Sequence, residues 1–184
     1  MDVTRIGFAP GVYDLFHVGH LNILRQARRH CDRLVAGVTT DDLVQRLKGR
    51  PPVVPFAERL EIVGNLRCVD VAVPESEEDK LETWKRIGFH VIFKGDDWRG
   101  TPKWVDLERR FAQVGVEVVY FPYTMHTSST LLRDSLELLA RHQRTDFPSA
   151  QLAEPLDQEG RHEQEVGQQQ GAVHGKEDVL AAKE

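Results

Sequence analysis

The sequence predicts an α/β fold, with a parallel sheet of about five strands flanked by helices. Two patterns predict it. Short apolar segments, typical of buried strands, alternate along residues 1–141 with segments whose apolar residues recur every three or four positions, as on one face of a helix. Strands that are separated by helices are joined by crossovers and therefore run parallel. Sheets of this kind bind ligands in the crevice outside the carboxyl ends of their strands.

The individual elements follow from these two patterns. Strands are expected at residues 6–9, 34–38, 69–73, 91–94 and 116–121. Helices are expected where apolar side chains share one face, over residues 21–31, 56–63, 104–114 and about 128–140. Most consecutive strands are thus separated by a helix, as crossover connections require.

Length and composition restrict the class of protein. With 184 residues, of which 40% are hydrophobic and 29% charged, the chain is predicted to form one globular domain. No stretch has the length and apolar character of a transmembrane helix or a secretory signal peptide, so we expect a cytoplasmic protein without membrane insertion. Cys31 and Cys68 lack metal-ligand spacing, which argues against a zinc site or a disulfide framework and fits a reducing compartment.

Composition and charge change towards the end of the chain. We expect a domain over residues 1–141 and an acidic tail, rich in Gln and Glu, over residues 142–184. Residues 151–184 contain no aromatic side chain, so the tail is predicted to bury too little apolar surface to fold and to be disordered. The formal net charge of −5 lies entirely within residues 144–184. A body with balanced charge is not typical of nucleic-acid-binding proteins, so we expect any anion it binds to be small.

One segment combines several features of a phosphate site. The sequence PGVYDLFHVGH follows the first expected strand and leads into a helix. Gly11 lets the backbone approach a ligand closely, and His17 and His20 lie three positions apart, so both imidazoles can point to one side. The helix N-terminus adds unpaired N–H groups and partial positive charge. The segment therefore predicts a site for phosphate oxygens. The simpler alternative is a capping turn with two surface or half-buried histidines.

At these residues the chain resembles a known family. GVYDLFHVGH is similar to the signature of the HxGH nucleotidyltransferases, and among them of the cytidylyltransferases that form CDP-alcohols. Four later segments resemble the family in the same order, namely TTDDLVQRLKG, PFAERLEIVGNLRCVDVAVP, FKGDDW and TSST. The resemblance covers about residues 5–135 and is strongest to the glycerol-3-phosphate cytidylyltransferase group. It implies a Rossmann-like nucleotidyltransferase fold and the transfer of CMP from CTP to a small phosphorylated alcohol such as glycerol 3-phosphate, with release of pyrophosphate.

The resemblance also implies roles for residues in catalysis. His17 and His20 would stabilise the charge that develops on the α-phosphate. Lys48 would hold the triphosphate, with Arg50 as its rival because this segment has one extra residue, and Arg67 would bind phosphate. Without the resemblance, Lys48 and Arg50 are ordinary loop charges, and Arg67 is an ion-pair partner for the acidic residue three positions later.

Other residues are implied in binding the two substrates. Asp14 would order the HxGH turn, Asp97 would contact the nucleoside, and Ser128 and Ser129 would offer hydroxyl and N–H groups to the β- and γ-phosphates. The implied nucleotide-binding set is Gly11, Val12, Tyr13, Asp14, Asp97, Tyr123, Thr124, Ser128 and Ser129. The implied phosphate- or acceptor-binding set is Arg59, Asp70 and Arg50, where Arg59 has a structural carboxylate as its alternative partner. The alternative role of Ser128 is that of a helix N-cap.

The resemblance further implies Mg²⁺ that is carried by the nucleotide with few protein ligands, and a homodimer. No histidine outside the HxGH segment has ligand spacing, so no structural metal is predicted. Three positions depart from the family pattern: Tyr123 replaces an arginine, His126 replaces a glycine, and Val12 stands where a hydroxyl is frequent. Because a tyrosine cannot supply the donors and the charge of an arginine, two alternatives stay open. These are an adenylyltransferase acting on a sugar phosphate or another small phosphate, and a catalytically silent nucleotide-binding or interaction module.

Overall fold

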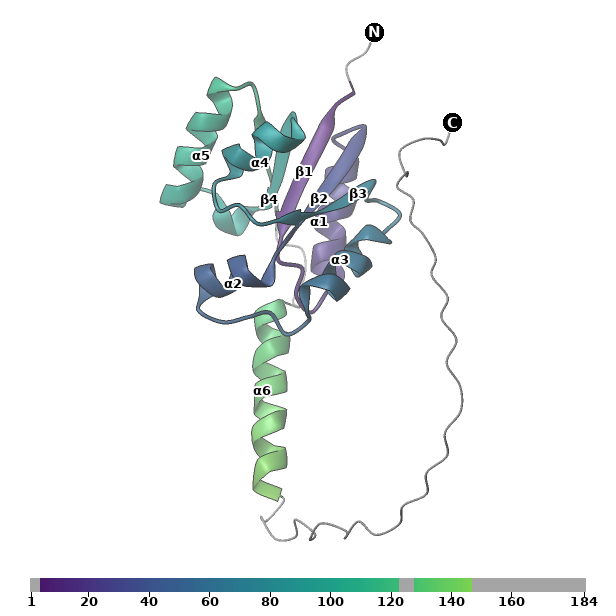
Figure 1. Ribbon diagram of the computed structural model, residues 1–184, viewed down its shortest axis with the longest axis vertical. Coiled ribbons are helices and arrows are strands. Elements are labelled where there is room, and N and C mark those ends of the chain that lie inside the picture. Colours follow the sequence, from purple (N-terminus) through teal and green to yellow (C-terminus); the bar gives the residue numbers. More distant parts are fainter. Residues whose placement is uncertain (1–3, 123–127, 147–184) are drawn as a thin grey trace, which may run out of the picture. The chain divides into compact units, whose positions relative to one another are not determined.

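The computed structural model describes residues 4–122 and 128–146 (Figure 1). Within these ranges the chain forms five strands, six α-helices and one short 3-10 helix. In chain order they are β1 (Ile6–Gly11), α1 (Val18–Arg28), β2 (Arg33–Thr39), α2 (Asp41–Lys48), α3 (Phe56–Gly64), β3 (Val71–Glu75), α4 (Lys80–Ile87), β4 (Val91–Gly95), η1 (Asp96–Trp98), α5 (Pro102–Gln113), β5 (Glu117–Phe121) and α6 (Ser129–Asp146).

The strands form one parallel sheet in the order β3-β2-β1-β4-β5. This confirms the predicted α/β class and the parallel five-stranded sheet. The chain adds strands outward on one side of β1 and then returns to add β4 and β5 on the other side. Such a reversal of direction leaves a crevice at the carboxyl ends of the central strands, β1 and β4.

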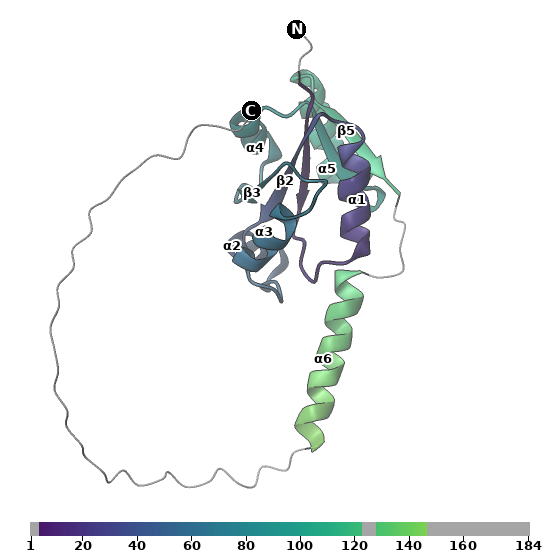
Figure 2. The same cartoon turned by 90° about the vertical axis from the view of Figure 1, so that its right-hand side faces the viewer.

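Helices cover both faces of the sheet, and each covered face has its own apolar core (Figure 2). Successive residues of β1 point to opposite faces: Phe8 packs in the core with α4 and α5, whereas Ala9 packs in the core with α1 and α3. Gly37 in β2 makes room for the ring of Phe8, because a Cβ at this glycine would lie 2.5 Å from the ring. Burial on both sides explains why the strands read as nearly continuous apolar runs.

Two helices were not predicted from the sequence. Both α2 and α4 have eight residues and end at a glycine in the left-handed region, Gly49 with φ 69° and Gly88 with φ 70°. Their first turns are capped by the side chains of Thr40 and Asp79, which accept hydrogen bonds from the backbone. Helices of two turns bury too few residues to show a clear periodic stripe, so the caps and glycines are their main sequence signals.

Two expected boundaries also shift. The third strand begins at Val71 rather than at residue 69, because the backbone at Val69 turns back to hydrogen-bond with Leu66. The last helix runs to Asp146, beyond the expected domain end at residue 141. The predicted tail from residue 147 onward lies outside the described residues.

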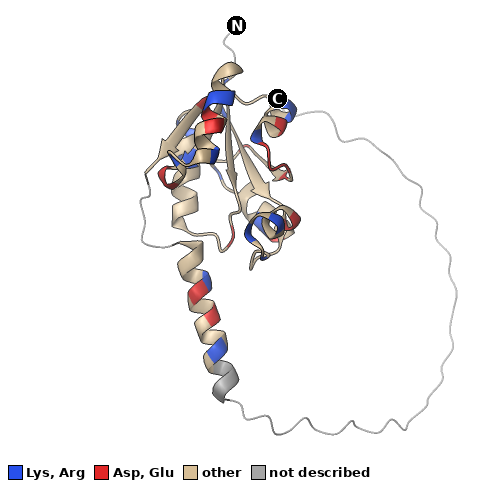
Figure 3. Cartoon of the chain, turned by 90° about the vertical axis from the view of Figure 1, so that its left-hand side faces the viewer, with Lys and Arg blue, Asp and Glu red and all other residues tan. Residues whose placement is uncertain are grey.

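The last helix contacts the rest of the domain through its first turns and extends beyond it in both views (Figures 1 and 2). Charged residues of both signs are interspersed over the domain and along α6, in keeping with the balanced charge of residues 1–143 (Figure 3). Of the helices in the described ranges, none combines the length and the apolar character needed to cross a membrane.

Candidate active site

A cavity of about 380 Å³ opens beside the carboxyl ends of the central strands. Its lining comes from the HxGH segment, α2, the start of α4, the residues around η1 and the first turn of α6. The topology therefore brings together segments that are more than a hundred positions apart in the sequence. It is at this place that the fold class predicts a ligand.

The two histidines of the HxGH segment lie side by side in the cavity lining. The ring centroids of His17 and His20 are 4.1 Å apart. His17 also caps α1, since its Nδ1 accepts a hydrogen bond of 3.1 Å from the N–H of Gly19. With Nδ1 as the acceptor, a neutral His17 carries its proton on Nε2, where it can be donated to a ligand. Burial lowers the pKa of His17.

His20 lies deeper and is neutral near physiological pH. Burial, and then the neighbouring His17, lower the pKa of His20 to about 3. Its ring lies against Tyr13 and Phe16, with centroids 5.5 Å away in both cases. Its Nδ1 is buried and has no hydrogen-bond partner among the described residues. Because buried polar atoms are nearly always paired, this nitrogen indicates a place for a ligand or a water molecule.

Lysines and arginines supply the positive charge of the cavity. Burial lowers the pKa values of both Lys48 and Lys94, and that of Lys94 falls to about 8. The ammonium group of Lys94 donates to the carbonyl of Pro10 at 3.3 Å and lies 4.9 Å from the ring centroid of Trp98. Several partly desolvated cations around one cavity favour an anionic ligand with more than one charge.

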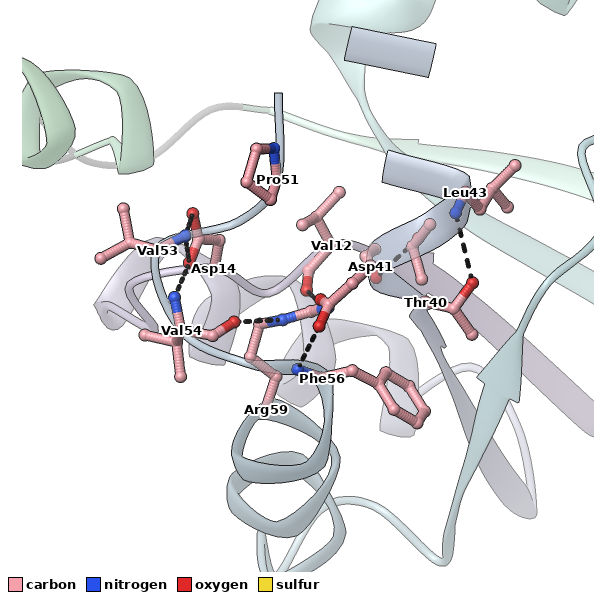
Figure 4. Close-up of polar contacts among 12 residues, drawn as sticks. Val12, Asp14, Thr40, Asp41, Leu43, Pro51, Val53, Val54, Phe56 and Arg59 are labelled. Carbon is pink, nitrogen blue, oxygen red and sulfur yellow. Dashed lines mark hydrogen bonds and ion pairs between the residues drawn. The ribbon is translucent and has the colours of Figure 1, made fainter. Parts of the chain in front are cut away.

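The turn before α1 is strained and is held by Asp14 (Figure 4). Tyr13 and Leu15 have φ angles of 56° and 48°, in the left-handed region that non-glycine residues seldom adopt. Between them, Asp14 accepts hydrogen bonds from the N–H groups of Val53 and Val54 and pairs with Arg133. Burial alone would raise the pKa of Asp14, but these N–H groups and Arg133 lower it below its usual value. Strain of this kind persists only where its surroundings impose it, which is typical of functional sites.

Comparison with known proteins decides the family. Residues 8–145 match the family model described as cytidylyltransferase-like. The chain belongs to the cytidylyltransferase-like family. This confirms the resemblance to the HxGH nucleotidyltransferases.

Curated relatives of this cytidylyltransferase-like protein are much longer than it is. It is 44% identical over 95 residues to the bifunctional protein HldE of Acidiphilium cryptum, a match that covers 51% of this chain and 20% of that protein. It is 37% identical over 129 residues to HldE of Rhodopseudomonas palustris, with 70% of this chain and 26% of that protein covered. The chain thus spans about a fifth to a quarter of the length of these relatives.

Solved structures agree with the fold. The lipopolysaccharide core biosynthesis protein of Thermoplasma volcanium has a TM-score of 0.57 and 25% identity, over 68% of this chain and all of that one. The pantoate-beta-alanine ligase of Francisella tularensis has a TM-score of 0.54 over 75% of this chain and 69% of that one. At 13% identity, the second match shows the fold alone.

In this cytidylyltransferase-like protein, Arg59 is a structural residue (Figure 4). Its guanidinium group is fully buried and is not part of the cavity lining. It donates to the carbonyls of Val12 and Val54 and pairs with the carboxylate of Asp41 at 2.6 Å. The sequence left two roles open for Arg59, binding a phosphate or pairing with a structural carboxylate. The structure shows the second arrangement, with Asp41 as the carboxylate.

Two more of the predicted residues lie outside the cavity lining. Arg67 is exposed. Asp70 accepts a hydrogen bond from the N–H of Leu34 at 2.6 Å and lies 3.7 Å from the guanidinium group of Arg28. The structure therefore ties Asp70 to the start of β2 and does not bring Arg67 or Asp70 to the histidines.

The remaining predicted residues that the structure describes line the cavity. The lining includes Gly11, Val12, Tyr13, Asp14, Lys48, Arg50, Asp97, Ser128 and Ser129. Tyr123 and Thr124 lie outside the described residues. Gly11 also has a packing role, because a Cβ at this position would lie 2.9 Å from the ring of Tyr13. Ser129 donates its hydroxyl to the carbonyl of Asp14 at 2.7 Å, and the hydroxyl of Ser128 accepts from the N–H of Leu131, as an N-cap does.

Sequence reasoning did not single out five charged lining residues, namely Glu78, Lys80, Lys94, Lys103 and Arg133. Lys94 had a recognisable signal, since it interrupts an otherwise apolar strand that is buried on both sides. Arg133 follows the TSST segment by three positions, one helical turn into the last helix. Lys80 carried no signal, because only the folded topology brings it to the cavity.

Proposed function

We propose that this chain transfers a nucleoside monophosphate from a nucleoside triphosphate to the phosphate group of a small phosphorylated sugar and releases pyrophosphate. The observation that carries the proposal is the pair of adjacent imidazoles, His17 and His20, in a lysine-lined cavity at the carboxyl end of β1. Membership in a nucleotidyltransferase family supports the reaction type.

The proposed chemistry needs no nucleophilic side chain. An oxygen of the acceptor phosphate attacks the α-phosphorus and forms the new P–O bond, while the bond from the α-phosphorus to the bridging oxygen breaks. Pyrophosphate leaves with the electron pair. Since the attacking group is already anionic, the protein has to position the reactants and stabilise charge on the transferring phosphate.

The histidines fit the second task. His17 presents its Nε2 proton to the cavity, because Nδ1 is occupied by the N–H of Gly19. His20 is held neutral by burial and can serve as a hydrogen-bonding group without bringing a full charge. Lys48 and the hydroxyl of Ser128 border the same space and would hold the leaving phosphates. Preorganised donors in a desolvated cavity are worth more than the same donors in water.

Mg²⁺ belongs to the proposal as a companion of the nucleotide. The described residues contain no group of three or more histidine, cysteine or acidic side chains that could bind a metal ion by themselves. A cation held mainly by the triphosphate and water requires no such group. When bound, Mg²⁺ would neutralise part of the charge on the phosphates. Asp97, which follows β4 and lines the cavity, is a carboxylate that could approach the ion.

We favour a sugar phosphate over glycerol 3-phosphate as the acceptor, and ATP over CTP as the donor. The similarity to HldE and to a lipopolysaccharide core biosynthesis protein supports this choice. Transfer of CMP to glycerol 3-phosphate is the second candidate. The GDDW segment, whose Asp97 lines the cavity, and the cytidylyltransferase-like family model favour it.

A pyrophosphate-release assay tests the proposal. The protein with Mg²⁺ would be given ATP, CTP, GTP or UTP, each combined with sugar 1-phosphates, glycerol 3-phosphate, phosphocholine or phosphoethanolamine. Release that requires ATP and a sugar phosphate, and that H17A abolishes, supports the proposal. Release with CTP and glycerol 3-phosphate supports the second candidate. Nucleotide binding without release in any combination contradicts both and favours a silent binding module.

A further inference from the structure

We propose that Lys80, held by the buried carboxylate of Glu75, binds the phosphate group of the acceptor together with Lys94. The inference rests on the proposed function and names the part of its cavity that receives the acceptor. It assigns Lys80 and Lys94 to substrate binding and Glu75 to positioning Lys80.

Lys80 and Glu75 form an ion pair at the wall of the cavity. Glu75 is the last residue of β3, is fully buried, and accepts a hydrogen bond of 2.8 Å from the hydroxyl of Thr83. Lys80 is the first residue of α4, and its Nζ lies 3.3 Å from Oε1 of Glu75. Of the two residues, Lys80 alone belongs to the cavity lining. The pair therefore presents its cation, and not its anion, to the ligand.

The ammonium group of Lys80 has a donor left for a ligand. A lysine carries three N–H donors. One is directed to Glu75 and one to the carbonyl of Glu77 at 2.6 Å. Among the described residues, no acceptor is recorded for the third. The two protein partners fix the direction of the side chain, so the third N–H is preorganised for an anion in the cavity.

Charge around Lys80 favours a phosphate as that anion. Besides burial, the charge of Lys80 is a main cause of the lowered pKa of Lys94, so the two ammonium groups lie close enough to repel each other. Burial lowers the pKa of Lys80; Glu75 and Glu78 oppose this shift, and Lys103, at the start of α5, adds to it. Lysines act on phosphates as compact point charges, and two of them match the dianion of a phosphate monoester.

Lys80 lies in a different part of the cavity from Lys48, which is expected to hold the triphosphate. Besides burial, the charges that shift the pKa of Lys48 belong to Arg133, Arg50 and Asp14, which are residues beside α2 and α6. The corresponding charges for Lys80 belong to Glu75, Lys103 and Glu78, beside α4 and α5.

Lys94 links these two groups, since both Lys80 and Lys48 act on its pKa. Figure 1 shows the same separation, with α2 beside the start of α6 and α4 beside α5. An in-line transfer needs the attacking phosphate on the side opposite to the leaving pyrophosphate. If the triphosphate binds beside Lys48, the acceptor phosphate binds on the opposite side, at Lys80 and Lys94.

Steady-state kinetics of Lys80→Gln test the inference. The glutamine is one bond shorter than the lysine, stays polar and removes the charge. We expect the KM for the acceptor to rise roughly 10- to 100-fold, as for the loss of a hydrogen bond to a charged group. The affinity for the nucleotide should change by less than about twofold, and Lys80→Arg should restore most of the acceptor affinity. The matched control is Lys85→Gln, because Lys85 is an exposed lysine of the same helix, paired with Glu82.

Glu75→Gln tests the positioning role. It retains an acceptor for the hydroxyl of Thr83 but loses the charge that holds Lys80. The KM for the acceptor should rise, by less than in Lys80→Gln, and the double variant should be no worse than Lys80→Gln alone. Two outcomes overturn the inference: an unchanged acceptor KM in Lys80→Gln, or a loss of nucleotide affinity as large as the loss of acceptor affinity.

The inference can be tested even if the proposed function fails. If the wild-type protein releases no pyrophosphate with any combination, inorganic phosphate would be titrated calorimetrically into protein saturated with a non-hydrolysable nucleotide analogue. Binding that Lys80→Gln weakens at least about tenfold, and that Lys85→Gln leaves unchanged, supports the subsite without turnover. No binding to the wild type, or equal binding to the wild type and Lys80→Gln, overturns it.

Discussion

Arg133 of α6 forms an ion pair with Asp14 in the turn before α1, across 119 positions of the chain. Asp14 is 4% exposed, and the Arg133 side chain is 16% exposed. The same carboxylate accepts from the N–H groups of Val53 and Val54 in the segment before α3. One side chain thus fixes three segments around the strained turn that leads to His17 and His20. This arrangement makes Asp14 a structural centre of the site.

Replacing Asp14 by Asn should lower the free energy of unfolding by roughly 3–5 kcal/mol, because it leaves Arg133 without its counter-charge in a largely buried position. Urea unfolding at neutral pH measures the change. Glu137→Gln is the matched control, since Glu137 and Arg50 form an exposed pair at 3.8 Å, worth under about 1 kcal/mol. A loss no larger than that of the control would contradict the central role of Asp14.

The same variant should change how stability depends on pH. The pKa of Asp14 is lower in the folded than in the unfolded chain. The stabilisation that results is present above the ordinary pKa of the carboxyl and is lost as the pH falls through the lowered value. Asp14→Asn lacks this contribution, so the two proteins should converge in stability in acid. A constant difference over the whole acid range would show that the Asp14 charge is not its source.

Arg59→Met tests the structural role of the buried arginine. The variant leaves the carbonyls of Val12 and Val54 and the carboxylate of Asp41 without their donor. We expect a loss of roughly 3–5 kcal/mol in urea unfolding, whereas Arg109→Met, at an exposed ion pair with Asp106, should cost under about 1 kcal/mol. A protein of normal stability that binds nucleotide poorly would instead favour the phosphate-binding role.

Alanine variants of the two histidines should fold and lose turnover. Removing either His17 or His20 should lower kcat by roughly 10²–10³-fold, as for the loss of one preorganised donor. His17→Ala should also cost about 1 kcal/mol of stability, because His17 caps α1. Pyrophosphate release and urea unfolding measure the two effects. His30→Ala, at an exposed histidine that does not line the cavity, is the control; equal losses in all three variants would contradict the role of the pair.

Local patterns predicted what depends on local order. The apolar runs predicted the five-stranded sheet, and the spacing of His17 and His20 predicted that their rings point to the same side. What the patterns could not predict depends on contacts between distant segments. Arg59 pairs with Asp41 only because the fold brings α3 to the start of α2, and Lys80 influences the pKa of Lys94 only because α4 connects β3 to β4. Neither pairing leaves a periodic trace in the sequence, so charge partners and cavity cations required the folded chain.

Lys94 should set the alkaline limit of activity. Burial, followed by the charge of Lys80, lowers the pKa of Lys94 to about 8, so the group loses its positive charge as the pH rises through that value. Asp97 and Glu75 oppose the shift, whereas Lys48 adds to it. If this charge helps to bind the acceptor phosphate, kcat/KM for the acceptor falls above about pH 8, because kcat/KM reports the free enzyme.

Lys94→Arg separates this cause from a general loss of activity at high pH. An arginine stays charged throughout the range, so the alkaline fall should disappear even if the larger side chain reduces the maximal rate. Lys85→Arg, at an exposed lysine that pairs with Glu82 and does not line the cavity, should keep the wild-type profile. The measurement is kcat/KM for the acceptor across the alkaline range in all three proteins. A wild-type profile without the fall, or the same fall in Lys94→Arg, would show that the charge of Lys94 does not act on the acceptor.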